Sequence, residues 1–194
     1  LQEKRTLAQI AAAAKQGNAE AEFAWAGLSA LGFDALLAQA QVYVTGDQAF
    51  RLLTQSADHR YLPALVETGL CFYAGRWVPQ STERALHAWS DAAARGSKDA
   101  RVRIAMTSLR STEDTTGWGK SVATLMSAAE EGSVLAEVGL GYCFETGSGV
   151  QAIKAEAARY YRAASLRGSQ DAFRALRRMH DAIRPEGSEF QIIE

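Results

Sequence analysis

The sequence predicts an all-α protein built as a solenoid of helix pairs, on the basis of a strict internal repeat and an alanine-rich composition. A phrase of small residues recurs with its last residue at Arg60, Gly96, Gly132 and Gly168, and an alanine follows four residues later in each copy. We call these last residues anchors; they are 36 residues apart. A period of this length that holds two helical stretches is typical of an α-solenoid, whose units bury their apolar faces against their neighbours. The chain has 37 alanines and three prolines, which favours closely packed helices.

A further copy of the phrase ends at Gly17, which lies 43 residues before Arg60. Its unit therefore holds a seven-residue insertion, which we place within residues 32–46. The insertion either extends a helix or forms a lid over the end of a groove, and both alternatives stay open. We predict one solenoid domain over residues 1–184, with units 1–16 (partial), 17–59, 60–95, 96–131, 132–167 and 168–184 (a terminal helix), followed by a tail at 185–194.

Each full unit is expected to hold a first helix that follows the anchor and a second helix that ends at the next anchor. The first covers residues 62–73 and 134–144, and the second covers residues 81–95 and 155–167. Glycine at the anchor fits a left-handed residue just after the second helix, where the missing Cβ removes the steric cost. Arg60 stands at one anchor, so that turn is either strained or closed differently.

The residues of two copies carry a family resemblance. One copy has Ala136, Leu140, Gly141, Phe144, Gly147, Gly149, Val150, Tyr161 and Ala164, and another has Ala64, Gly69, Phe72, Gly75, Val78, Ala85, Trp89 and Ala92. In this pattern the chain resembles the Sel1-like repeat, a relative of the tetratricopeptide repeat, firmly over residues 49–176 and loosely over 1–48. The copy between them departs from it, because Gly117-Trp118-Gly119 replaces the glycine–valine turn. The resemblance implies a right-handed α–α superhelix that binds another protein, and slightly favours the bacterial periplasm or export over the cytoplasm.

Length, composition and charge exclude several classes of protein. The chain has 194 residues, 47% hydrophobic and 22% charged, which fits a globular domain and not a disordered one. No apolar run approaches the roughly 20 residues of a membrane span. The net charge of −1 gives no overall attraction to nucleic acid or membrane. The chain starts at Leu1 without a basic segment and an apolar stretch, so we expect no signal peptide in the sequence as given.

One face of each first helix is expected to be packed against its partner helix. The fourth, eighth and twelfth residues after the anchor form this row, and the small ninth residue leaves room for a neighbouring backbone. Cys71 and Cys143 border the row. They lie two repeats apart, about 20 Å at roughly 10 Å per helix layer, which is too far for a disulfide. We interpret them as buried small hydrophobic residues.

The sixth, tenth and thirteenth residues after the anchor form a candidate binding surface. First helices normally line the concave side of a solenoid, so this apolar stripe would be a groove for a peptide or a partner's helix. The sixth position (Val66, Val102, Val138) either joins this surface or packs between successive first helices. We expect the tenth position to be exposed and to supply the anchoring side chains. The predicted partner-binding residues are Val66, Glu67, Leu70, Tyr73, Arg103, Met106 and Tyr142, with Glu67 and Arg103 orienting the partner through polar contacts.

Charge is unevenly distributed in the second half of the chain. Residues 111–156 carry a net charge of −5, whereas residues 159–184 hold seven arginines against two aspartates. Arginine suits protein interfaces, so Arg174 and Arg178 would extend the binding surface toward the basic end. The alternative is a solvated cap on the last helix, which a solenoid requires.

No motif points to catalysis, a metal or a cofactor. His59, His87 and His180 lie at different registers and lack the spacing of metal ligands. No lysine follows Gly147-Ser148-Gly149 in the manner of a phosphate loop. The sequence therefore predicts no enzyme and no cofactor.

Two tryptophans in the turns between helices, Trp77 and Trp118, are secondary interface candidates. The alternative is that each ring folds back as a plug of the core. Trp89 shares its register with Leu53, Leu125 and Tyr161, so we expect it to be a core residue.

The predicted function is a non-enzymatic protein–protein interaction module of the adaptor or inhibitor type, which binds a partner protein through its concave face. The resemblance implies two narrower possibilities for that partner, a secreted effector or an envelope signalling protein. The first alternative is a bacterial immunity protein that neutralises a secreted toxic effector, and the second is a self-assembling structural scaffold. We expect a monomer or weak homodimer that binds no nucleic acid.

Overall fold

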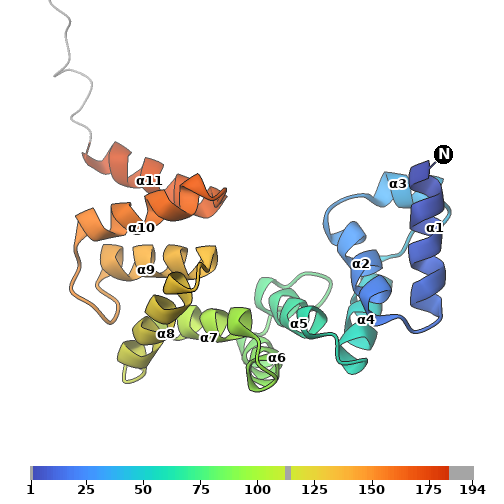
Figure 1. Ribbon diagram of the computed structural model, residues 1–194, viewed down its shortest axis with the longest axis horizontal. Coiled ribbons are helices and arrows are strands. Elements are labelled where there is room, and N and C mark those ends of the chain that lie inside the picture. The colour runs from blue at the N-terminus through green and yellow to red at the C-terminus, as the bar shows by residue number, and fades with distance from the viewer. Residues whose placement is uncertain (1, 112–114, 184–194) are drawn as a thin grey trace, which may run out of the picture. The chain divides into compact units, whose positions relative to one another are not determined.

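The computed structural model describes residues 2–111 and 115–183, so the predicted tail at 185–194 and Arg184 lie outside it. The described residues form eleven α-helices and no strand, which confirms the all-α prediction. They are labelled in Figure 1: α1 (Gln2–Lys15), α2 (Ala19–Ala30), α3 (Asp34–Gln39), α4 (Gly46–Asp58), α5 (Leu62–Ala74), α6 (Thr82–Ala94), α7 (Lys98–Arg110), α8 (Trp118–Glu130), α9 (Val134–Thr146), α10 (Lys154–Leu166) and α11 (Gln170–Ile183).

The helices alternate as the repeat predicts. In the repeat, α2, α5, α7, α9 and α11 take the place of first helices, and α4, α6, α8 and α10 that of second helices. The chain divides into two compact units, unit 1 (residues 1–101) and unit 2 (residues 102–194), and each is described by itself. In unit 1, α2 packs on α1 and α4, and α5 packs on α4 and α6. In unit 2, α9 packs between α8 and α10, and α11 covers α10 (Figure 1).

The anchors adopt the left-handed conformation that their glycines predicted. The φ angles are +81° at Gly17, +96° at Gly96, +89° at Gly132 and +91° at Gly168. Arg60 has φ +67°, and its amide donates to the Ala57 carbonyl just as that of Gly96 donates to Ala93. Of the two alternatives at Arg60, the structure has the strained turn, because a side chain in this conformation costs about 1–2 kcal/mol.

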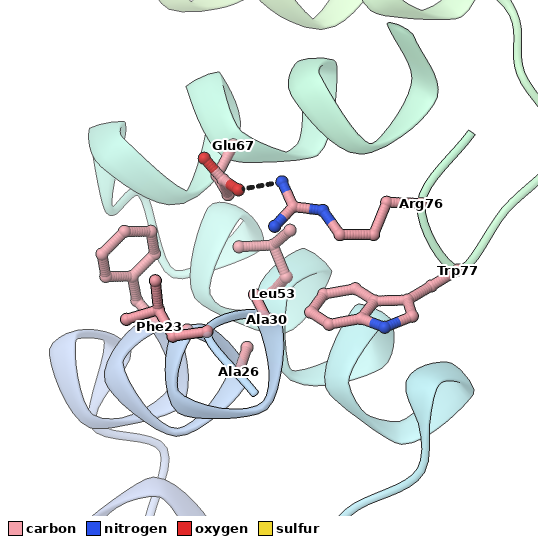
Figure 2. Close-up of a pocket in the computed structure, with 9 residues that line it drawn as sticks. Phe23, Ala26, Ala30, Leu53, Glu67, Arg76 and Trp77 are labelled. Carbon is pink, nitrogen blue, oxygen red and sulfur yellow. Dashed lines mark hydrogen bonds and ion pairs between the residues drawn. The ribbon is translucent and has the colours of Figure 1, made fainter. Parts of the chain in front are cut away.

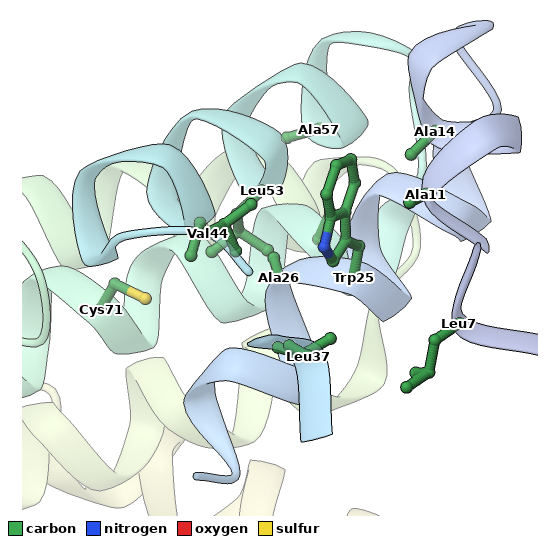
Figure 3. Packing of buried hydrophobic residues seen from close by; sticks show 12 residues of the cluster. Leu7, Ala11, Ala14, Trp25, Ala26, Leu37, Val44, Leu53, Ala57 and Cys71 are labelled. Carbon is green, nitrogen blue, oxygen red and sulfur yellow. The ribbon is translucent and has the colours of Figure 1, made fainter. Parts of the chain in front are cut away.

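The seven-residue insertion is folded into unit 1. Gly32, at φ +81°, ends α2, and the chain then forms the separate helix α3, so the insertion does not extend α2. Leu37 of α3 is fully buried, and the side chain of Val44, which follows α3, is buried as well. Trp25 of α2 joins the insertion to the core, because its Nε1 donates to the Val42 carbonyl at 2.8 Å. Figure 3 shows Trp25 in the same buried cluster as Leu37 and Val44 of the insertion.

A large side chain from each second helix fills the centre of its repeat. Leu53, Trp89, Leu125 and Tyr161 are all buried, which confirms that this register is core. In two repeats an aromatic ring covers the glycine at the ninth position of the first helix. A Cβ at Gly141 would lie 2.5 Å from ring atoms of Tyr161. The prediction that the ninth residue makes room for a backbone was therefore wrong, since the room is taken by a ring.

Cys71 and Cys143 are fully buried and free, as predicted. Removal from water disfavours the thiolate, so burial raises the pKa of each thiol to about 11.

Candidate protein-binding pocket

Unit 1 contains an apolar pocket of about 270 Å³ on the side of its first helices. We call it the unit-1 pocket. Helix α2 forms one wall, α5 and the turn that follows it form the other, and Leu53 of α4 lies at the base (Figure 2). The lining residues are Phe23, Ala26, Gly27, Ala30, Leu31, Leu53, Glu67, Arg76 and Trp77.

The pocket exists because the first repeat has small residues where the other repeats have large ones. Gly27 and Ala30 are the tenth and thirteenth residues after the Gly17 anchor. At the tenth position the later repeats have Leu70, Met106 and Tyr142, and at the thirteenth they have Tyr73 and Leu109. A Cβ built at Gly27 would meet nothing within 4 Å. The cavity is thus the volume that a repeat side chain would otherwise occupy.

The opposite wall is shaped by Trp77. Its φ of +64° is left-handed, as is that of Gly149 at the same place in a later repeat. The indole lies against Gly46, where a Cβ would be 2.5 Å from the ring, so α4 must have glycine there. Trp77 is half-buried and packs against the core of unit 1, and the guanidinium of Arg76 lies 5.3 Å from its ring centroid.

The polar edge of the pocket is one ion pair. Arg76 donates through Nη2 to Glu67 Oε1 (Figure 2). The side chains are 33% and 29% exposed, so both partners remain in contact with water. An exposed pair of this kind adds at most about 1 kcal/mol of stability, but it places a polar group beside the apolar opening.

The pocket contains two residues that the sequence predicted for binding, Glu67 and Trp77. The other seven lining residues were not predicted for binding, among them Phe23, Gly27 and Ala30 of α2 and Arg76 of the turn. The signal was available, because Phe23, Gly27 and Ala30 are the sixth, tenth and thirteenth residues after Gly17, the registers used in the later repeats.

In the later repeats the sixth position is buried or half-buried, so Val66 is not the exposed side chain that the predicted surface requires. Val66 is 7% exposed and Val102 is 1% exposed, while Val138 is half-buried against the core of unit 2. The carbonyl of Val66 accepts a hydrogen bond from Trp89 Nε1 at 3.0 Å. The burial of Val66 and Val102 agrees with packing between helices, which was the alternative kept open for this position.

The predicted anchoring residues are half-buried. Leu70 and Tyr73 belong to unit 1, where the Tyr73 ring lies 5.5 Å from that of Trp89. Met106 and Tyr142 belong to unit 2, where Met106 packs against the core and Arg110 lies over the Tyr142 ring at 5.9 Å. Arg103 is also half-buried. Their role in binding stays a prediction.

Trp118 folds back onto its own unit. Its Nε1 donates to the Ser108 carbonyl at 3.1 Å, and its ring packs against the core of unit 2. This half-buried position agrees with the plug that was the alternative to an interface role.

The basic residues of α10 and α11 pair with the preceding acidic segment inside unit 2. Arg178 bonds both carboxylate oxygens of Glu145 at 2.6 Å, and the Tyr161 hydroxyl donates to the same carboxylate at 2.8 Å. Desolvation, and then the neighbouring carboxylate, raise the pKa of Tyr161. Arg174, in contrast, is exposed and makes only a 3.7 Å contact with Asp171. Arg178 therefore ties α11 to α9 although its side chain is 65% exposed, and Arg174 is exposed as well.

The part of the chain that the structure describes holds no cluster of three or more histidine, cysteine or acidic residues that could bind a metal ion. Among the same residues, no helix combines the length and apolar character of a membrane span.

Comparison with models of known protein families gives no match. Solved structures do match. The chain is similar to the crystal structure of a Sel1 repeat protein from Oxalobacter formigenes, with a TM-score of 0.70 and 19% identity, over 89% of this chain and 66% of that one. It is also similar to a protective antigen of uropathogenic Escherichia coli strains that displays an SLR (Sel1-like repeat) fold, with a TM-score of 0.64 and 22% identity, over 91% of this chain and 36% of that one. The chain thus spans about two thirds of one neighbour and about a third of the other. Together with the 36-residue repeat and its helix pairs, these likenesses show that the chain has the Sel1-like repeat fold.

Proposed function

We propose that this chain is a non-enzymatic protein-binding module, and that it holds its partner by taking a large apolar side chain into the unit-1 pocket. Repeat proteins with this fold commonly serve as protein–protein interaction modules, which supports the general class. The observation that carries the proposal is the gap at Gly27, where a register filled by Leu70 elsewhere in unit 1 is left open.

The size and lining of the pocket support a side chain as its occupant. Pockets for drug-sized ligands usually measure about 300–1,000 Å³, so about 270 Å³ suits one or two side chains better. Burying a leucine or phenylalanine side chain contributes about 1.5–3 kcal/mol, and a rigid helical wall adds little ordering cost. Interfaces of this kind depend on a few such buried anchors.

The experiment uses two variants of Gly27. Gly27→Leu places in the pocket the side chain that stands at the tenth position of the next repeat, and it suits a helix better than glycine. Gly27→Ala keeps the pocket largely open and serves as the matched control. The partner captured by wild type from a lysate of the source organism is identified, purified and titrated by calorimetry.

We expect a complex of fixed stoichiometry that Gly27→Leu weakens at least tenfold and Gly27→Ala changes little. A complex that Gly27→Leu leaves intact would refute the pocket as the binding site. The narrower roles, adaptor, immunity protein or inhibitor of an effector, depend on which protein is captured.

A further inference from the structure

Three acidic residues stand close in the sequence to residues of the unit-1 pocket and its walls. Glu20 stands one turn before Phe23 on α2, Asp34 follows Leu31 by three residues, and Asp47 is next to Gly46 at the base of Trp77. All three acidic residues are exposed.

These carboxylates are not neutralised within the described part of the chain. Glu20 and Asp47 form no ion pair there, and Asp34 accepts a hydrogen bond only from the Ser29 hydroxyl, at 3.3 Å. Residues 19–58, which supply most of the pocket, hold five acidic residues and a single arginine, Arg51. The cation at the pocket itself, Arg76, is already paired with Glu67. The segments that form the pocket therefore carry an exposed negative charge that a partner can complement.

The other repeats indicate the size of the occupant. The side chains that stand at the tenth position elsewhere are Leu70, Met106 and Tyr142. An occupant of the open position in the first repeat should fall in the same range, from leucine to a single aromatic ring.

We infer that the unit-1 pocket binds a protein segment that carries one leucine- to phenylalanine-sized side chain with lysine or arginine residues beside it. The apolar side chain fills the gap above Gly27, and the basic residues face Glu20, Asp34 and Asp47. This inference rests on the proposed function and adds the chemistry of the partner. Exposed charges act over about 8 Å at physiological salt, so the basic residues must lie within a turn or two of the anchor.

The test uses three synthetic helical peptides with a fluorescent label. The first has a phenylalanine anchor flanked by arginines, the second has the same anchor flanked by glutamates, and the third has the arginines but an alanine anchor. Their binding is measured by fluorescence anisotropy against the full chain, against Gly27→Leu and Gly27→Ala, and against an Asp34→Lys/Asp47→Lys double variant.

The first peptide should bind at least tenfold more tightly than either of the others, since it alone has both the anchor and the charge. Gly27→Leu should weaken it at least tenfold, and Gly27→Ala should not. The double lysine variant should favour glutamate flanks over arginine flanks, and added salt should reduce both preferences. Circular dichroism and thermal unfolding of each variant confirm that it is folded.

Equal binding of the two phenylalanine peptides, or no binding of the first, would overturn the inference. If Gly27→Leu abolishes the binding of both phenylalanine peptides equally, the pocket is a binding site without a charge preference, so the proposed function stands and this inference fails. A second copy of the chain is the competing occupant, because the exposed Phe173 of α11 lies beside Arg174 and Arg177. Sedimentation that shows self-association, lost in both Gly27→Leu and Phe173→Glu, would replace a separate partner with that second copy.

Discussion

Replacing Arg60 by glycine should stabilise the protein, although it removes a side chain. Arg60 is the one anchor that is not glycine among residues 17, 60, 96, 132 and 168, and it holds the same left-handed conformation as the others, with φ +67°. Its side chain is exposed and forms no hydrogen bond or ion pair with any residue that the structure describes. The substitution therefore removes backbone strain and breaks no contact.

The expected magnitude follows from two opposing terms. A residue with a Cβ in the left-handed region costs about 1–2 kcal/mol. Glycine also makes the unfolded chain more flexible, which lowers the free energy of unfolding by about 0.5–1 kcal/mol and so offsets part of the relieved strain. The net gain for Arg60→Gly is about 0.5–1 kcal/mol in the free energy of unfolding. For a unit of about 100 residues this raises Tm by about 2–6 °C.

Two control variants separate backbone strain from the loss of the arginine. Arg60→Ala removes the same charge but keeps the left-handed cost, so its stability should stay close to wild type. Gly96→Arg makes the reverse change at an anchor where an added Cβ meets nothing within 4 Å, and it should destabilise by a similar amount. Urea unfolding followed by circular dichroism and tryptophan fluorescence measures all three, at an unchanged m value. The reasoning fails if Arg60→Gly is no more stable than Arg60→Ala.

Three further results are expected from the core. The thiols of Cys71 and Cys143, whose pKa values are raised to about 11 by burial, should not react with a disulfide reagent at pH 8 until urea unfolds the chain; fast labelling of the native protein would contradict their burial. Gly141→Ala should destabilise by about 1–2 kcal/mol in urea unfolding, because the added Cβ collides with an aromatic ring 2.5 Å away and overpacking outweighs the gain in helix propensity; a more stable variant would refute this. His59→Ala should cost about 1–3 kcal/mol, because it leaves the Glu22 carboxylate, 4% exposed, without the His59 Nδ1 partner 2.9 Å away, and His59→Gln should recover part of the loss in the same assay.

The repeat made much of the fold predictable. All copies of the repeat have the same backbone conformation, so the glycines at positions 96, 132 and 168 predict the same left-handed turn in three places. The same logic placed Trp89 in the core from the register that it shares with Leu53. Such positions are predictable because each repeats the same local geometry, and their environment needs no knowledge of distant contacts.

Features that depend on a neighbouring helix were harder to predict. Val66 was assigned to the surface because it lies beside Leu70 on a helical projection, but it is only 7% exposed. The two carboxylates Glu22 and Glu137 each stand five residues after an anchor and pair with the residue before the next anchor, His59 or Arg167. A side chain taken alone does not reveal such a pair, since its partner comes from the following helix.

The unit-1 pocket was missed for a different reason, because it is formed by missing atoms. A search for apolar anchors finds large residues, and it passes over Gly27 and Ala30, which open the cavity. The informative signal is a departure from the repeat, and the structure distinguishes two kinds of departure. Arg60 departs from glycine with no contact to compensate its strain, whereas Trp77 departs from glycine in the same conformation and forms a wall of the pocket. Trp77 combines backbone strain with a ring that shapes the pocket. Strained residues of this kind cluster at functional sites, so the shape of the pocket is the feature that this strain maintains. In a repeat protein of this kind, binding sites are best sought where one repeat has glycine or alanine at a position that is large in the other repeats, and where a nearby turn has a large residue in place of the usual glycine.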